Sequence, residues 1–358
     1  MSIPAAFQKT QSSSDFSPVS MSLNISQKVK EMVLNLQKKQ GTFLTETMQC
    51  IKNQETESCF YGIQSDEQMV KDQDGQENIN DTVKRYAEIK AHILQKMGLQ
   101  PNFPVLQVVG DSAAFSLQGT QKAMKFLQQH LSSHSAIAYG YTGHFGSDGT
   151  QCVNAAVSTY IIQNGLVGQT IGNLVGFHTP TALDSWGCSG PTLNHYLLVY
   201  GKDESRRETG TVFGDDITTS DFLSDQLIML EGGIQSFRQA CNFLLLERPI
   251  IALTGLRGEK TRFALTEDGQ SKNYFTAPEF LEFMKNKVKD GKEETTPSDE
   301  ILNGWYDEYL HTRLLSDPKR GDYDTKKKLL DDAWKLFKGE KLYKKLHLFT
   351  CENASTAM

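Results

Sequence analysis

Short apolar runs alternate with stretches of helical periodicity between residues 104 and 258, and this alternation constrains the fold more than any other feature of the sequence. Runs typical of strands occupy residues 105–109, 136–139, 170–175, 195–200, 226–230 and 249–253. Helical patterns between them cover residues 115–131, 151–163 and 235–246. The apolar runs are nearly continuous, as in strands that are buried on both faces. This order predicts an α/β protein in which a parallel sheet carries helices on both faces.

The rest of the chain divides into flanking regions that differ in composition and periodicity. Residues 1–24 are rich in Ser and Gln, and we expect a disordered leader there. Residues 25–100 predict a helical segment that is interrupted by a polar, acidic loop over residues 49–76. Residues 101–260 hold the predicted sheet, and residues 261–358 are expected to be mostly helical.

The composition argues against several classes of protein. The 358 residues carry 37 Lys and Arg against 43 Asp and Glu, and the net charge of -6 argues against a general nucleic-acid binder. No apolar run approaches the roughly 18 residues of a membrane span. The leader has neither the basic start nor the apolar centre of a Sec signal peptide. We therefore expect a cytoplasmic protein, or one secreted by a route without such a signal.

Cysteine and histidine spacing gives no sign of a metal site. The six cysteines include no C-x-x-C pair, and no histidine has metal-ligand spacing to a second ligand. We expect neither a metal nor a cofactor. Lysines crowd the final helix between residues 326 and 345, but the acidic residues among them favour a solvated, internally paired face over contact with a membrane or nucleic acid.

Three glycine-bearing turns follow predicted strands and precede predicted helices. Ligands of an open parallel sheet bind beyond the carboxyl ends of its strands, where glycine permits close approach and helix N–H groups attract phosphate or carboxylate. Any strand-to-helix turn uses glycine, yet three such turns favour a ligand cleft. The spacing is neither G-x-G-x-x-G nor G-x-x-x-x-G-K-[ST]. The candidate ligand-binding residues in these turns are Gly110, Asp111, Ser112, Gly143, His144, Gly146, Gly149, Thr150, Gly232, Gly233 and Ser236.

The segments VLQVVGDSAAF, AIAYGYTGHFGSDGTQCVNAAV and SDQLIMLEGGIQSFRQACNFLLLERPIIALTG together resemble the SLOG superfamily, which includes the LOG or lysine decarboxylase-like proteins. The resemblance covers residues 104 to 258, under half the chain. It implies a Rossmann-like sheet that holds a nucleotide-derived ligand. The LOG members cleave the N-glycosidic bond of nucleoside monophosphates.

The catalytic motif of that family, P-G-G-x-G-T-x-x-E, falls on residues 231–239 of this chain. Gly232 and Gly233 match it, and Ser236 stands in for the Thr. The closing Glu is Gln239, and a neutral amide cannot take a proton at neutral pH, which argues against LOG-type hydrolysis. Glu231 replaces the first Pro. It would take over the missing carboxylate function, bind a ribose or an amine, or simply favour the start of the helix.

Three further positions have a functional and a structural interpretation. The resemblance implies that Arg206 or Arg207 corresponds to the family's upstream arginine, which would grip a phosphate; a solvated loop is the alternative. Asp111 would accept a ribose hydroxyl or cap a helix. His144 would act as a general acid or phosphate donor, or lie exposed in its loop.

These observations leave three functions open. The first is binding of a nucleotide-like small molecule without LOG-type hydrolysis. The second is a hydrolase or transferase that acts on an N-glycosidic or phosphate bond of a nucleotide. The third is a non-catalytic interaction protein, because the polar leader, the acidic loop and the Lys-rich tail are similar to those of secreted bacterial effectors. A homodimer is also left open.

Overall fold

The computed structural model describes fourteen parts of the chain. These are residues 49–52, 57–64, 79–96, 98–110, 115–131, 136–140, 170–174, 195–200, 221–257, 263–265, 271–273, 275–290, 297–313 and 323–354. The expected leader and the expected helix over residues 151–163 lie outside them. No helix in these parts is long and apolar enough to cross a membrane.

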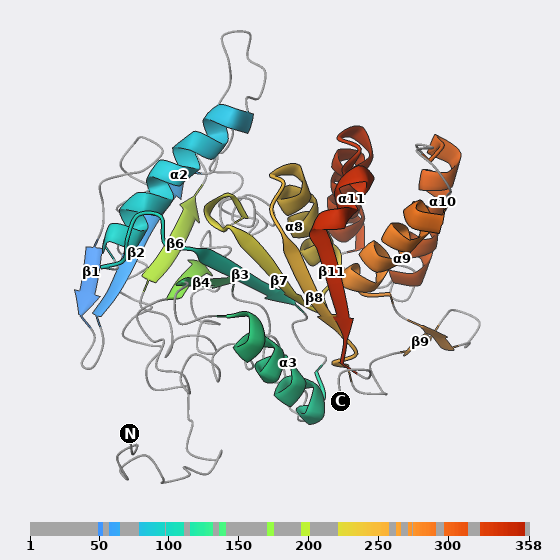
Figure 1. The fold of residues 1–358 in the computed structure, drawn as a ribbon, viewed down its shortest axis with the longest axis horizontal. Coiled ribbons are helices and arrows are strands. Elements are labelled where there is room, and N and C mark those ends of the chain that lie inside the picture. Colours follow the sequence, from blue (N-terminus) through green and yellow to red (C-terminus); the bar gives the residue numbers. More distant parts are fainter. Residues whose placement is uncertain are drawn as a thin grey trace.

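Nine strands of the described chain form one sheet in the order β1-β2-β6-β5-β4-β3-β7-β8-β11 (Figure 1). Every neighbouring pair is parallel except β1 and β2 at one edge. A separate antiparallel pair joins β9 (Phe263–Leu265) to β10 (Ser271–Asn273). The strands of the large sheet are β1 (Gln49–Lys52), β2 (Glu57–Gln64), β3 (Val105–Gly110), β4 (Ala136–Gly140), β5 (Thr170–Leu174), β6 (His195–Tyr200), β7 (Gln226–Leu230), β8 (Ile250–Thr254) and β11 (Phe349–Asn353).

The strand order reverses between β3 and β7. From β3 the chain first adds β4 and β5 on one side, and then places β7, β8 and β11 on the other. This is the strand order of a Rossmann fold, whose ligands bind where the order reverses. The expected Rossmann-like parallel sheet is therefore confirmed, with β6, β2 and β1 added beyond β5.

Helices cover both faces of the sheet, as the alternation of patterns predicts. In Figure 1, α3 (Leu117–His130) lies on one side, while α8 (Ile234–Leu245), α9 (Ala277–Asp290) and α11 (Tyr323–Gly339) lie on the other. Ser116 caps α3 by accepting a hydrogen bond from the Gly119 amide at 2.9 Å. The remaining helices are α2 (Ile79–Lys96), α10 (Asp299–Arg313) and the short 3-10 helix η6 (Leu342–Leu348).

The main core lies between the sheet and the helices on the face that α8 covers. Phe237 on α8 is fully buried, and its ring centroid lies 5.7 Å from that of Phe280 and 5.8 Å from those of Tyr309 and Phe337. Burial of one such side chain contributes about 1.5–3 kcal/mol relative to its exposure. These aromatic contacts join α8 to α9, α10 and α11, so the C-terminal helices are part of the same core as the sheet.

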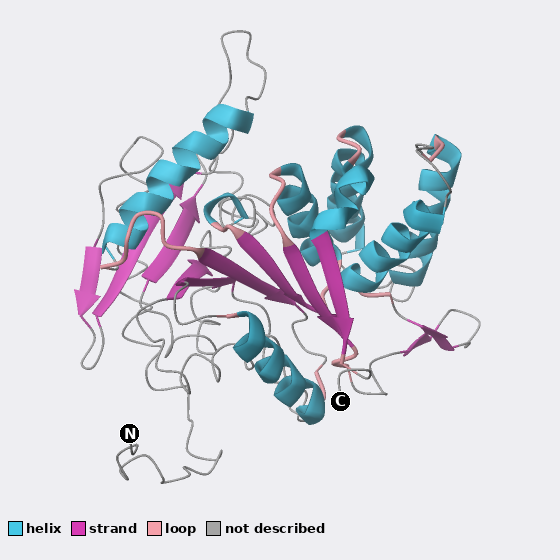
Figure 2. Cartoon of the chain, viewed as in Figure 1, coloured by secondary structure: helices cyan, strands magenta, loops and turns pink. Residues whose placement is uncertain are grey.

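Two parts of the sheet differ from the sequence prediction. The expected loop over residues 49–76 contains β1 and β2, and the C-terminal segment contributes β11 (Figure 2). β2 reads ESCFYGIQ and β11 reads FTCEN, so both mix strand-forming and polar residues over a few positions. Polar residues interrupt both runs, so neither has the continuous apolar character of a strand that is buried on both faces.

Candidate functional site

The point where the strand order reverses brings two glycine turns together. β3 and β7 are neighbours, and Gly110 at the end of β3 pairs in register with Leu230 at the end of β7. β4 lies on the other side of β3, with Val108 opposite Tyr139. The carboxyl ends of these strands thus share one edge of the sheet. We call the place where the carboxyl ends of β3 and β7 meet, with Glu231, Gly232 and Gly233 after β7, the switch point.

Gly110 and Gly232 are positions where no side chain fits. A Cβ on Gly110 would overlap the Leu230 carbonyl oxygen, and a Cβ on Gly232 would overlap Ser236 Oγ. Gly232 also has a φ of +118°, which L side chains rarely adopt. The same Cβ position on Gly232 lies 3.6 Å from the Gly110 Cα. The backbones of Gly110 and Gly232 therefore lie close together, and glycine is required at both positions.

The helix α8 begins directly after this turn. The helix begins at Ile234 after the cap residue Gly233, which offers no side-chain oxygen. Within the described chain, the backbone N–H groups of Ile234 and Gln235 donate no hydrogen bond. Free N–H groups and the helix dipole together favour an anion at such a position.

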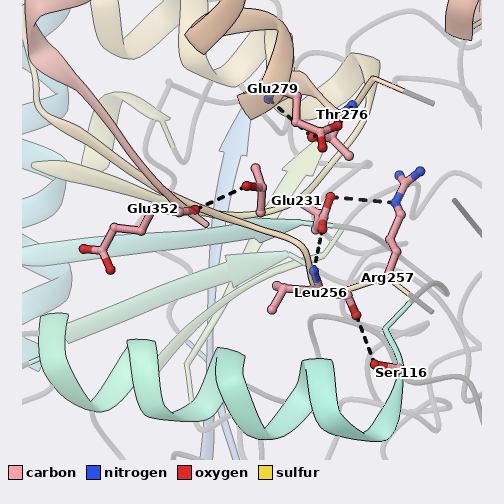
Figure 3. Close-up of polar contacts among 8 residues, drawn as sticks. Ser116, Glu231, Leu256, Arg257, Thr276, Glu279 and Glu352 are labelled. Atoms are coloured by element: carbon pink, nitrogen blue, oxygen red, sulfur yellow. Dashed lines mark hydrogen bonds and ion pairs between the residues drawn. The ribbon is translucent and has the colours of Figure 1, made fainter. Parts of the chain in front are cut away.

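Glu231 is a buried carboxylate at the carboxyl end of β7 (Figure 3). Its side chain is 2% exposed and its backbone is left-handed, with a φ of 59°. Oε1 accepts a hydrogen bond from the Leu256 amide at 2.7 Å, and Oε2 lies 3.8 Å from Arg257 Nε. Ser116 Oγ in turn donates to the Leu256 carbonyl at 3.4 Å. Glu231 thus joins the end of β7 to the segment after β8 and, through it, to the start of α3.

Arg257 is a residue that the sequence analysis missed. Its side chain is only 6% exposed and pairs with Glu231. A basic residue two positions after Gly255, at the end of the last predicted strand, was the available signal. The resemblance to the SLOG superfamily implies Arg206 or Arg207 as the phosphate-binding arginine, and both lie outside the described residues.

The start of α9 is attached to the same turn. The Ala277 amide donates to the Gly232 carbonyl at 2.8 Å. Glu279 accepts hydrogen bonds from the Thr276 amide at 2.8 Å and from Thr276 Oγ1 at 3.0 Å, which forms a capping box (Figure 3). Two helices therefore begin next to Gly232, but α9 already has a carboxylate at its N-terminus, whereas α8 has none.

Gln239 takes part in a buried cluster that the sequence did not predict. Its Nε2 lies 3.4 Å from Asp221 Oδ1, which also accepts a hydrogen bond from Gln107 Nε2 at 2.8 Å. Asn242 Nδ2 donates to Asp221 Oδ2 at 2.7 Å. Burial raises the pKa of Asp221 to about 8, although these amides and the charge of Arg238 partly offset the effect. Gln239 is thus engaged with an interior carboxyl group.

Of the predicted ligand-binding residues, the structure brings together Gly110, Gly232, Gly233 and Ser236, with Glu231 beside them. Ser236 is buried against Gly232. Among the described residues, no group of three His, Cys, Asp or Glu side chains is close enough to hold a metal ion. The predicted residues outside the described parts are Asp111, Ser112, Gly143, His144, Gly146, Gly149, Thr150, Arg206 and Arg207.

Comparison with known proteins adds no assignment to this geometry. Scanned against models of protein families, the chain matches none. A search of curated proteins also finds no match. The resemblance to the SLOG superfamily therefore stays an expectation from the sequence segments, and any function has to be argued from the site itself.

Proposed function

We propose that the switch point binds the phosphate group of a nucleotide or nucleotide-derived ligand. One observation carries the proposal: the backbones of Gly110 and Gly232 lie close together where the strand order reverses, beside the uncapped N-terminus of α8. In folds with this strand order, the reversal is where ligands bind, and a helix N-terminus there favours phosphate. The SLOG-like sequence segments support the same class of ligand.

Binding without hydrolysis is the version of this function that the residues support best. LOG-type hydrolysis uses a Glu where this chain has Gln239, and the Gln239 amide contacts the buried Asp221 carboxyl. The carboxylate of Glu231 lies close to the proposed phosphate position, but Arg257 balances its charge. The dipole and N–H groups of α8 then decide the preference for an anion.

A second candidate function is cleavage of the N-glycosidic bond with Glu231 as the carboxylate. Its left-handed backbone and its burial favour this, because strained backbone in a non-glycine residue is concentrated at functional sites. Incubation with AMP, followed by chromatography for free adenine, tests it directly. Release of adenine that is abolished in Glu231→Gln would establish hydrolysis, and no release would leave binding alone.

Isothermal calorimetry with AMP, ribose 5-phosphate and adenosine tests the binding proposal. The two phosphates should bind more tightly than adenosine by about tenfold or more. Gln235→Glu places a negative charge in the first turn of α8, which the helix dipole tolerates but a bound phosphate does not. We expect this variant to weaken AMP binding by about tenfold.

The matched control is Gln128→Glu, the same change at an exposed position near the C-terminal end of a different helix, α3. It should bind AMP like the unchanged protein. If AMP and ribose 5-phosphate do not bind at all, or if both variants bind equally, the proposal is wrong and a non-catalytic interaction protein becomes the better hypothesis.

A further inference from the structure

A cavity of about 500 Å³ lies among the C-terminal helices, away from the switch point. Its lining comes from α10, α11 and the turn before η6, and includes Leu302, Tyr306, Trp334, Lys335 and Lys341. None of its lining residues belongs to the switch point. Pockets that hold small organic ligands have volumes of roughly 300–1,000 Å³.

The acidic side chains of this cavity already have basic or hydroxyl partners. Asp299 Oδ2 lies 3.0 Å from Lys338 Nζ, and Asp331 Oδ2 lies 2.7 Å from Lys327 Nζ. Tyr306 also donates its hydroxyl hydrogen to Asp331 Oδ1. Both carboxylates are therefore compensated and leave no uncompensated negative charge in the lining.

Two lysines of the cavity are still uncompensated. Lys335 and Lys341 are exposed, and the side-chain ammonium group of neither forms an ion pair or hydrogen bond within the described parts of the chain. Since the two aspartates are paired with other lysines, these two ammonium groups give the cavity a positive charge. An anionic group is the natural partner for them.

The inner wall is apolar and aromatic. Leu302 is 2% exposed and Trp334 is 6% exposed. The Trp334 ring stacks on Tyr306, with 5.2 Å between the ring centroids, and on Phe337, with 5.3 Å. Trp334 Nε1–H is buried and has no acceptor among the described residues, although a buried indole normally finds one. The cavity thus combines an apolar wall with two lysines.

We propose that this cavity, the α10–α11 cavity, binds a small carboxylate with a flat apolar body. The body packs against Leu302 and the edges of Tyr306 and Trp334, and the carboxylate lies between Lys335 and Lys341. A neutral molecule of the same shape lacks the ion pairs, and a short anion lacks the apolar contact. The class of ligand therefore needs both parts.

Benzoate is the probe, with benzamide as its neutral counterpart and acetate as the anion without the ring. The chain has three tryptophans, so Trp186→Phe with Trp305→Phe leaves Trp334 as the only one and lets its fluorescence report occupancy. We expect saturable binding of benzoate with a dissociation constant at or below about 1 mM, and binding of benzamide and acetate about tenfold weaker or more. Calorimetry on the unchanged chain repeats the measurement without any substitution.

Lys335→Gln combined with Lys341→Gln should weaken benzoate binding by about tenfold. The control is Lys328→Gln combined with Lys344→Gln, two exposed lysines nearby that do not line the cavity. Three results would each overturn the proposal. These are equal affinity for benzoate and benzamide, unchanged benzoate binding in the Lys335→Gln, Lys341→Gln variant, and no saturation by about 10 mM benzoate. Thermal unfolding of both double variants establishes that they are folded.

Discussion

Asn242 on α8 donates a hydrogen bond to the carboxyl group of Asp221, which is fully removed from water. Gln107 on β3 donates to the same carboxyl from the sheet. A polar group that links the central strand to the helix behind it makes the stability of this fold depend on the ionisation of one side chain.

The first prediction concerns that ionisation. Burial raises the pKa of Asp221 to about 8 in the fold, against an ordinary value of 3.8 for an aspartate. The folded chain therefore holds a proton between these values that the unfolded chain has lost. The contribution of this proton to the free energy of unfolding is full below about pH 4. Above that pH it falls by up to about 1.4 kcal/mol per pH unit, and it is lost as the pH rises through 8.

Asp221→Asn should remove this slope, because its amide does not ionise and Gln107 Oε1, which is buried without a partner in the described structure, can accept its N–H. Urea unfolding at about pH 5, 6, 7 and 8 gives the comparison. Asp307→Asn, an exposed site on α10, serves as control and should keep the slope. Parallel curves for the unchanged chain and Asp221→Asn would contradict the prediction.

A second prediction concerns Gly232→Ala. The added methyl group would overlap Ser236 Oγ at a φ of +118°, so we expect a loss of about 2–4 kcal/mol in the free energy of unfolding. Gly304→Ala on α10 is the matched change, since its methyl group would meet nothing within 4 Å. It should stabilise by about 0.5–1 kcal/mol, and the contrast is measured by urea denaturation.

Arg248→Met tests the segment that leads into β7. Arg248 Nη1 donates to the carbonyl of Asp221 at 2.8 Å, to that of Phe222 at 2.9 Å and to that of Ser224. Loss of these hydrogen bonds from a charged donor should cost about 2–4 kcal/mol in thermal or urea unfolding. Arg248→Lys should recover a part of that, and a Met variant as stable as the parent would show that water replaces the arginine.

Glu231→Gln should change stability and binding in opposite directions. The amide oxygen still accepts the Leu256 N–H, but Arg257 loses its buried counter-charge, which should cost about 3–5 kcal/mol. Under the proposed function, removal of the negative charge should tighten AMP binding. Calorimetry and urea unfolding on the same preparation give both values, and weaker AMP binding would assign Glu231 a direct contact with the ligand.

Much of this architecture could be predicted because central strands and helices leave periodic patterns. β3, β7 and β8 match the predicted runs to within one residue at each end, since all three are buried apolar segments. On α8 the buried Phe237, Cys241 and Leu244 repeat at helical spacing. The glycines at Gly110 and Gly232 could be predicted for a different reason, because only glycine permits the close backbone approach at these two positions.

The rest depends on contacts that no local pattern encodes. Arg257 and Asp221 are buried polar residues whose partners lie 26 and 21 positions away, at Glu231 and Asn242. Their role follows from tertiary packing, whereas the local sequence around each of them predicts only a polar loop. The strands of the edges, β1, β2 and β11, were missed because their polar residues hide the alternation.

The placement of β11 has a consequence for biosynthesis. β8 is completed at Thr254, yet its outer partner begins only at Phe349, where Phe349 pairs with Ile250. During translation the exposed flank of β8 must wait for nearly a hundred further residues before its partner leaves the ribosome. The three helices α9, α10 and α11 emerge during that interval, so they can shield the nascent sheet before its last strand arrives.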